Sequence, residues 1–387
     1  MENVTGDPQL DIVAQRWPDI TLAEAADVLS RLRHPLRVLE LLTRSGRPTA
    51  AGAMIRTNEG DVFIKRYALS VRDAASILPY HGFVHYLAER GVSTPTFMPF
   101  AEAVDASVPD GRIQATASAL TIGGAVYEVC AKAEGDDRYI DALSWDPPRT
   151  VSEAEQLGAF MARMSMAAEG YDAPRPAAPN PFQNRFGLFA TADFDAAVKA
   201  WLEERPVVRD YLKSTDRHLM QDLDLHRCYV EKVSGPYGAL PSCWTHGDPH
   251  ISNFLWQGDR PSSIFDFGLA DRNTALFDLV ETLERNTIRF VSIMNGDDDA
   301  YCADTAAAII RGYNGVIPLS SSDLALVADM LPVCQSEAAL NWIAYYVEGT
   351  HRPQDAAWCY DISLMGHTAW FARPSGQRYL DAIRMAA

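Results

Sequence analysis

The spacing of hydrophobic positions along the chain changes from a strand period to a helical period. Near the amino terminus, apolar residues recur at helical spacing over 21–33 after the capping-box pair Thr21 and Glu24, which predicts a first helix. Two apolar runs, at 53–56 and 62–67, flank a Gly-containing turn and predict a β-hairpin.

The same part of the chain contains one more predicted helix and two more strand-like runs. Ser70 and Asp73 precede a helical pattern that runs to about Arg90. Strand-like runs then cover 112–120 and 125–131. We therefore expect an amino-terminal domain over residues 1–130, mainly sheet, with a helical extension at its start.

From about residue 150 the pattern becomes mainly helical. Ser152 and Glu155 form a second capping pattern ahead of an apolar stripe. Two short strands, near 243–245 and 263–265, interrupt the helical pattern, which then continues almost to the end. These features predict a helical carboxy-terminal domain over residues 131–387 and an α+β fold overall.

Composition narrows the class of protein. At 387 residues the chain is long enough for two domains, and its net charge of -17 argues against a nucleic-acid partner. The six cysteines show no metal-site or disulfide spacing. We find no signal peptide and no apolar run of the roughly 18 residues that a membrane helix needs. We therefore expect a cytoplasmic protein without a membrane partner; no pattern indicates its oligomeric state.

The candidate chemistry lies between residues 245 and 268. Asp248 follows His-Gly in a loop, Asn253 lies five residues later, and Asp266 follows a short apolar strand. Phosphoryl transfer needs a carboxylate that orients and deprotonates the attacking hydroxyl, and hard oxygen ligands for Mg²⁺. These three residues are of the types that this reaction requires.

The two motifs resemble those of the aminoglycoside phosphotransferase and choline kinase branch of the protein-kinase-like superfamily. The segment 246–253 is similar to its H-G-D-x-H-x-x-N loop, and 264–268 to its metal-binding strand end. A third element, 277–279, is similar to a helix start in that branch. The resemblance implies a bilobal protein-kinase-like fold, with a small sheet-rich N-lobe, a large mainly helical C-lobe, and ATP in the cleft.

The resemblance also implies roles for individual residues. Asp248 would be the catalytic base or the residue that orients the hydroxyl, and Asn253 and Asp266 would bind Mg²⁺. His246 and Asp278 would support the catalytic loop.

The nucleotide would contact the amino-terminal domain. Lys65 resembles the strand lysine that binds the α- and β-phosphates of ATP, and the backbone of Glu128, Val129 and Cys130 resembles the hinge that binds adenine. Two features depart from the family pattern. No carboxylate lies in the middle of the helix after Lys65, where a glutamate partner is usual, and the loop at 45–52 is not glycine-rich.

These observations predict an ATP- and Mg²⁺-dependent kinase of a small polar molecule, such as an aminoglycoside, amino alcohol, amino acid or sugar. The candidate acceptor-binding residues are Glu281, Arg285, Glu337 and Tyr345. The missing helix glutamate keeps a non-catalytic, regulatory pseudokinase as the alternative. A protein kinase fits less well, since only a dozen residues separate Asp266 from Asp278.

Overall fold

The computed structural model describes residues 17–46, 49–101, 113–116, 118–175 and 183–386. Residues 47 and 48 of the 45–52 loop and residues 112 and 117 of the predicted 112–120 strand lie outside the described residues. The chain divides into two compact units. The first comprises Met1–His85, Thr94–Glu134 and Ala173–Asn180, and the second comprises Tyr86–Ser93, Gly135–Asp172 and Pro181–Ala387.

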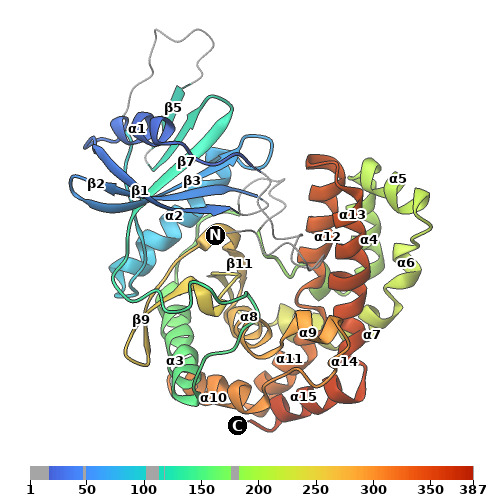
Figure 1. Ribbon diagram of the computed structural model, residues 1–387. Coiled ribbons are helices and arrows are strands. Elements are labelled where there is room, and N and C mark those ends of the chain that lie inside the picture. The colour runs from blue at the N-terminus through green and yellow to red at the C-terminus, as the bar shows by residue number, and fades with distance from the viewer. Residues whose placement is uncertain (1–16, 47–48, 102–112, 117, 176–182, 387) are drawn as a thin grey trace. The chain divides into compact units, whose positions relative to one another are not determined.

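The first unit contains an antiparallel sheet with strand order β1-β2-β3-β7-β6-β5, and β4 pairs with β7 (Figure 1). Apolar residues of α1 and of one sheet face form a common buried core. The helix α2 contacts the other face. The elements are α1 (Leu22–Ser30), β1 (Val38–Gly46), β2 (Ala51–Thr57), β3 (Gly60–Ala68), α2 (Ala74–Glu89), β4 (Thr96–Phe97), β5 (Ile113–Thr116), β6 (Ala119–Ile122) and β7 (Ala125–Ala131).

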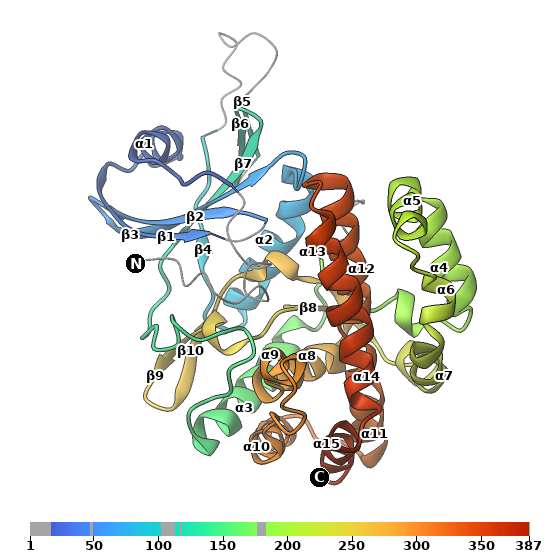
Figure 2. The ribbon, with the colours of Figure 1, turned by 45° about the vertical axis from the view of Figure 1, so that its right-hand side comes forward.

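The second unit is mainly helical and contains two short antiparallel pairs, β9 with β10 (Figure 2) and β8 with β11. Its first half contains α3 (Val151–Ala168), η2 (Leu188–Ala190), α4 (Phe194–Glu203), α5 (Pro206–Ser214), α6 (Leu219–Asp222), α7 (Asp224–Gly238), β8 (Ser242–Thr245), η3 (Ile251–Asn253), β9 (Phe254–Gln257), β10 (Arg260–Ile264), η4 (Phe267–Leu269) and β11 (Asp271–Thr274).

Helices form the remainder of the unit, in which the π-helical segment η6 follows α12 and the π-helical segment η7 joins α13 to α14. The elements are α8 (Ala275–Thr287), α9 (Phe290–Met294), α10 (Ala303–Asn314), α11 (Ser321–Met330), η5 (Leu331–Val333), α12 (Ser336–Ala344), η6 (Tyr345–Gly349), α13 (Pro353–Trp358), η7 (Cys359–Gly366), α14 (His367–Phe371) and α15 (Pro374–Arg384).

The helices α3 and α10 pack with their backbones in unusually close contact. A Cβ atom added to Gly158 of α3 would lie 1.9 Å from the carbonyl oxygen of Ile309. A Cβ atom added to Gly312 of α10 would lie 1.8 Å from the carbonyl oxygen of Glu155. Each helix therefore requires a glycine where it crosses the other.

The local predictions for the first unit agree with the structure at the first helix, at the hairpin and at the start of α2. The capping box of Thr21 and Glu24 is present on α1, β2 and β3 form the predicted hairpin, and the Asp73 carboxylate accepts the amide of Ser76 at the start of α2 (2.8 Å). The strand β1 was not predicted, because its residues show no alternation of buried and exposed positions.

Two predicted boundaries are wrong. The run at 112–120 contains two strands, β5 and β6, which pair with each other. The helix α3 is capped by Thr150 and Glu153 and not by Ser152 and Glu155. Both pairs have capping-box spacing, but the Glu153 carboxylate also accepts hydrogen bonds from Arg138 and Tyr139, at 3.0 and 2.7 Å. These contacts favour the start at Thr150.

The predicted α+β class, with an antiparallel sheet region followed by a mainly helical part, is confirmed. Within the described part of the chain, no helix is both long and apolar enough to cross a membrane.

Candidate active site

The loop after β8 is held in place by a buried carboxylate from α8. The two oxygens of Asp278 accept the backbone amides of His246 and Gly247, at 2.8 and 2.9 Å. Burial raises the pKa of the Asp278 carboxyl, and His246 and the two amides oppose that rise. Gly247 has a φ of +81°, and a Cβ there would lie 2.6 Å from the carbonyl oxygen of Leu269. The loop conformation therefore requires glycine at this position.

The imidazole of His246 links the two motif segments. Its Nδ1 accepts the backbone amide of Asp248 (3.1 Å), and its Nε2 lies 2.9 Å from the carbonyl oxygen of Phe265. Because Nδ1 is an acceptor, the proton of a neutral ring is on Nε2 and is donated to Phe265. The ring therefore fixes the position of Asp248 relative to the strand end before Asp266.

Asp248 is the partly exposed carboxylate of this loop, with 19% of its side chain accessible. Its backbone carbonyl accepts the side-chain amide of Asn253 at 2.9 Å. Two cationic or titratable groups approach its carboxylate. The Nε of Arg285 lies 3.4 Å from Oδ1, and the Nε2 of His250 lies 3.6 Å from Oδ2.

Asp266 adopts a left-handed backbone conformation, with φ 62° and ψ 59°, between β10 and η4. This region is uncommon for residues other than glycine, although Asp tolerates it better than most, and such conformations cluster at functional sites. The amide of Phe265 donates to the carbonyl of Asn253 at 3.0 Å. The backbones of the two predicted metal-binding segments are therefore adjacent.

Beside Asp248, the second half of α8 contributes a buried cluster of charges. The Nε of Arg285 lies 3.7 Å from Glu284 and 3.9 Å from Glu281, and both carboxylates are inaccessible to solvent. Burial raises the pKa of the Glu281 carboxyl well above its ordinary value; Arg285 opposes this shift, and Glu284 and Asp248 add to it. Burial alone would lower the pKa of Arg285, but the three carboxylates raise it.

Three residues outside α8 complete this cluster. The side-chain amide of Gln335 donates to Glu281 at 2.7 Å, and His367 lies 3.3 Å from Glu284. The Arg285 guanidinium lies over the ring of Trp145, 5.3 Å from its centroid. Sequence reasoning missed these residues, which come from distant segments and belong to no motif.

The other two predicted acceptor residues have different neighbours. The carboxylate of Glu337 accepts the backbone amide of Leu188 at 2.7 Å. Tyr345 is buried against the rings of Trp342 and Tyr346. Of the four predicted acceptor residues, Glu281 and Arg285 are therefore the pair that the structure brings to Asp248.

In the first unit, the residues that are predicted to bind the nucleotide lie on the neighbouring strands β3 and β7. Lys65 of β3 pairs directly with Glu128 of β7. That the backbone of 128–130 binds adenine stays a prediction. The carbonyl of Val129 accepts the amide of Met98 (2.8 Å), and the whole segment lies inside β7. That carbonyl is therefore engaged within the sheet.

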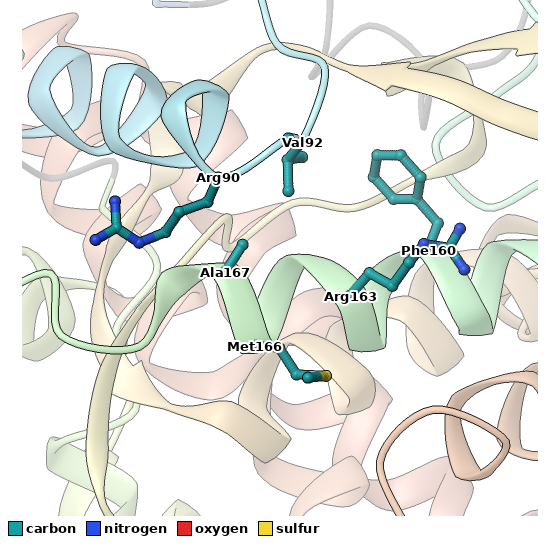
Figure 3. Close-up of a pocket in the computed structure, with 7 residues that line it drawn as sticks. Arg90, Val92, Phe160, Arg163, Met166 and Ala167 are labelled. Carbon is teal, nitrogen blue, oxygen red and sulfur yellow. The ribbon is translucent and has the colours of Figure 1, made fainter.

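A separate cavity of about 400 Å³ lies between α3 and the segment after α2 (Figure 3). Arg90, Gly91, Val92, Phe160, Arg163, Met166 and Ala167 line it. No predicted site residue is among them, so this cavity is distinct from the candidate active site.

Comparison with known proteins places these features in a family. Residues 53–315 match the family described as the phosphotransferase enzyme family. The homoserine kinase of Gluconobacter oxydans is 24% identical over 307 residues, which cover 78% of this chain and 80% of that protein. The homoserine kinase of a Janthinobacterium species is 26% identical over 295 residues, covering 75% and 76%.

Among solved structures, an amicoumacin kinase in complex with AMP-PNP, Ca²⁺ and Ami has a similar fold. The TM-score is 0.55 at 14% identity, and the alignment covers 89% of this chain and 94% of that one. The comparisons support the predicted small-molecule kinase, and they give no support to the pseudokinase alternative. The family match spans most of the chain and includes all three motifs, so this protein belongs to the phosphotransferase enzyme family.

Proposed function

We propose that this protein transfers the γ-phosphoryl group of ATP to the hydroxyl of a small amino acid, with homoserine as the first candidate. The observation that carries the proposal is the contact between the Asp248 carboxylate and Arg285, which is itself held in a buried acidic cluster. The homoserine kinases among the curated relatives support the same acceptor.

Asp248 would orient and deprotonate the acceptor hydroxyl. The acceptor oxygen attacks the γ-phosphorus and forms a new P–O bond, while the bond from that phosphorus to the β,γ-bridging oxygen breaks. ADP leaves with the electron pair of that bond, and the hydroxyl proton passes to Asp248 and then to solvent. The backbone amide of Asp248 donates to His246 and its carbonyl accepts from Asn253, and these two hydrogen bonds keep its carboxylate in position.

The donor set of the two motif segments fits Mg²⁺. A carboxylate from Asp266 and an amide oxygen from Asn253 are hard ligands, and Mg²⁺ in kinases completes its shell with phosphate oxygens and water. The Nδ2 of Asn253 donates to Asp248, which leaves its oxygen as the available donor. When bound, the ion would offset the negative charge of the phosphates. Lys65 would contact the α- and β-phosphates.

The charges beside Asp248 suit a zwitterionic acceptor. Arg285 is the cation of the cluster nearest the catalytic carboxylate and has 13% of its side chain exposed, so it would pair with the acceptor carboxylate. The carboxylate of Asp248 is partly exposed beside this guanidinium, and its negative charge favours an ammonium group on the acceptor. Glu337 and Tyr345 stay predictions for the same site.

The test is acceptor-dependent release of ADP from ATP and Mg²⁺. The panel would contain homoserine, the matching amino alcohol that lacks the carboxylate, aminoglycosides and sugars. We expect turnover with homoserine, a much higher KM for the amino alcohol, and a fall in kcat of about 10²- to 10⁴-fold on Asp248→Ala, with ATP affinity retained.

Two outcomes would contradict the proposal. Equal kcat/KM for homoserine and the amino alcohol would remove the role of Arg285 in binding a carboxylate. Wild-type turnover by Asp248→Ala would remove the role of that carboxylate in catalysis. ATP binding that Mg²⁺ does not strengthen would favour a pseudokinase.

A further inference from the structure

The helix that follows the lysine strand has no carboxylate at its centre. In α2 the acidic residues nearest to Lys65 in sequence are at the two ends. At the start, the carboxylate of Asp73 is engaged in capping, since it accepts the amide of Ser76 at 2.8 Å. At the other end, Glu89 is the last residue of the helix. The middle of α2 presents Tyr80 and His81 where the family pattern leads one to expect a glutamate.

A buried carboxylate reaches the same place from the neighbouring strand. Lys65 and Glu128 are directly paired in the antiparallel ladder of β3 and β7. Directly opposed side chains leave the same face of a sheet with their Cβ atoms about 5 Å apart. Tyr67, two residues after Lys65, projects from this face as well, and its hydroxyl lies 3.4 Å from the Glu128 carboxylate.

The Glu128 carboxylate is bonded to the centre of α2. It accepts a hydrogen bond from the Tyr80 hydroxyl, and the Nε2 of His81 lies 2.8 Å from its Oε2. The His81 ring is itself fixed, because its Nδ1 lies 2.7 Å from the Ser118 hydroxyl and it stacks on Phe97 at 3.6 Å. Glu128 therefore joins the lysine strand to α2.

The charges around Glu128 keep it ionised. Burial raises the pKa of its carboxyl, but the interaction with His81, the positive charge of Lys65 and the hydrogen bond from Tyr80 outweigh that effect and lower the pKa. Arg72, which is buried over the Tyr67 ring at 4.9 Å, also interacts with this carboxylate. An ionised carboxylate that is only 7% exposed requires such cationic neighbours.

We propose that Glu128 of β7 is the positioning residue for Lys65, in place of a helix glutamate, and that it ties the lysine to α2 through Tyr80 and His81. The proposal rests on the proposed function, because the lysine must bind nucleotide phosphates for its position to matter. It explains how the chain keeps a catalytic constellation without a carboxylate in the middle of α2.

The experiment is a double-mutant cycle between Glu128→Gln and Lys65→Met, read as kcat/KM for ATP with homoserine as acceptor. We expect Glu128→Gln to lose about 10- to 100-fold, as is typical when a partner that orients a site residue is removed, and Lys65→Met to lose at least as much because it removes the phosphate contact itself. If Glu128 acts through Lys65, the double variant will be no worse than Lys65→Met alone.

A matched control is Glu153→Gln. Glu153 is also a buried carboxylate that accepts a tyrosine hydroxyl, at 2.7 Å from Tyr139, but it caps α3 in the second unit. We expect Glu153→Gln to keep the wild-type kcat/KM for ATP. A loss found only in Glu128→Gln would then not be a general effect of removing a buried charge.

Wild-type kcat/KM for Glu128→Gln, or a double variant whose loss is the product of the two single losses, would overturn the proposal. If Lys65→Met is unaffected while Asp248→Ala is inactive, the phosphate role of Lys65 fails, and the proposal fails with it. If homoserine is not turned over, the Kd of AMP-PNP in the presence of Mg²⁺ is measured for the same variants instead. This measurement requires no acceptor.

If Glu128→Gln does not fold, Tyr80→Phe takes its place in the cycle. That change removes one donor to the Glu128 carboxylate and keeps the ring and the charge. A fall in kcat/KM for ATP that disappears in the Lys65→Met background would support the proposal. An unchanged value would overturn it.

Discussion

Replacing Arg285 with Met should destabilise the protein strongly, and more so at high pH. Arg285 lies 3.4 to 3.9 Å from three carboxylates, two of them inaccessible to solvent. At an effective dielectric constant of about 20, each contact is worth about 4 to 5 kcal/mol of gross attraction. Desolvation offsets most of this, and removing one partner of a buried ion pair has a net cost of about 3 to 5 kcal/mol.

The pH dependence follows from Glu281. Its pKa in the folded protein is raised above the ordinary value of 4.5, so the folded state binds more protons than the unfolded state. The stability that this group contributes is therefore present at low pH and is lost as the pH rises from about 4.5 toward the raised value. Arg285 lowers the pKa of Glu281 in the folded protein. Without Arg285, the pH interval between 4.5 and the folded-state pKa widens, so more stability is lost at high pH.

The assay is urea denaturation of the wild type and Arg285→Met at about pH 5 and about pH 8. The matched control is Arg163→Met, because Arg163 is an exposed arginine on α3 (Figure 3). Its free energy of unfolding should stay within about 0.5 kcal/mol of the wild-type value. A loss for Arg285→Met below about 1 kcal/mol at the higher pH, or an equal loss at both, would refute the reasoning.

Two further predictions concern helix packing and capping. Gly158→Ala should lower the free energy of unfolding by about 1 to 3 kcal/mol, because its Cβ would clash with the Ile309 carbonyl. Gly235→Ala in α7, where open space surrounds the glycine, should not destabilise the protein. Equal losses of unfolding free energy for the two variants would contradict the close crossing of α3 and α10. Thr150→Ala should lower the free energy of unfolding by about 1 kcal/mol, and Ser152→Ala should have little effect, because Thr150 caps α3. A larger loss for Ser152→Ala than for Thr150→Ala would instead indicate that Ser152 is the cap. Thermal or urea unfolding measures all four variants.

The sequence was most informative where a short segment specifies its own structure. The capping box at Thr21, the hairpin of β2 and β3, and the spacing of Asp248, Asn253 and Asp266 all depend on residues near one another in the chain. Backbone geometry and side-chain type are enough to recognise such patterns. The fold class and the kinase motifs could therefore be predicted.

Sequence was least informative where the choice depended on distant partners. The strands β9 and β11 are each four residues long and were not predicted, because they are stabilised by pairing with β10 and β8. The cap of α3 could not be chosen between two equal patterns until Arg138 and Tyr139 were seen to contact Glu153.

The sequence by itself identified the candidate residues for the chemistry, namely the carboxylates and amide of the two motifs and Lys65. Only the tertiary structure decided what surrounds them. It brought Arg285 and its acidic neighbours to Asp248, and it paired Glu128 with Lys65 across two strands. The physical reason is that the energy of a buried charge depends on its partners in space, and strand register and helix packing bring those partners together from segments far apart in the chain.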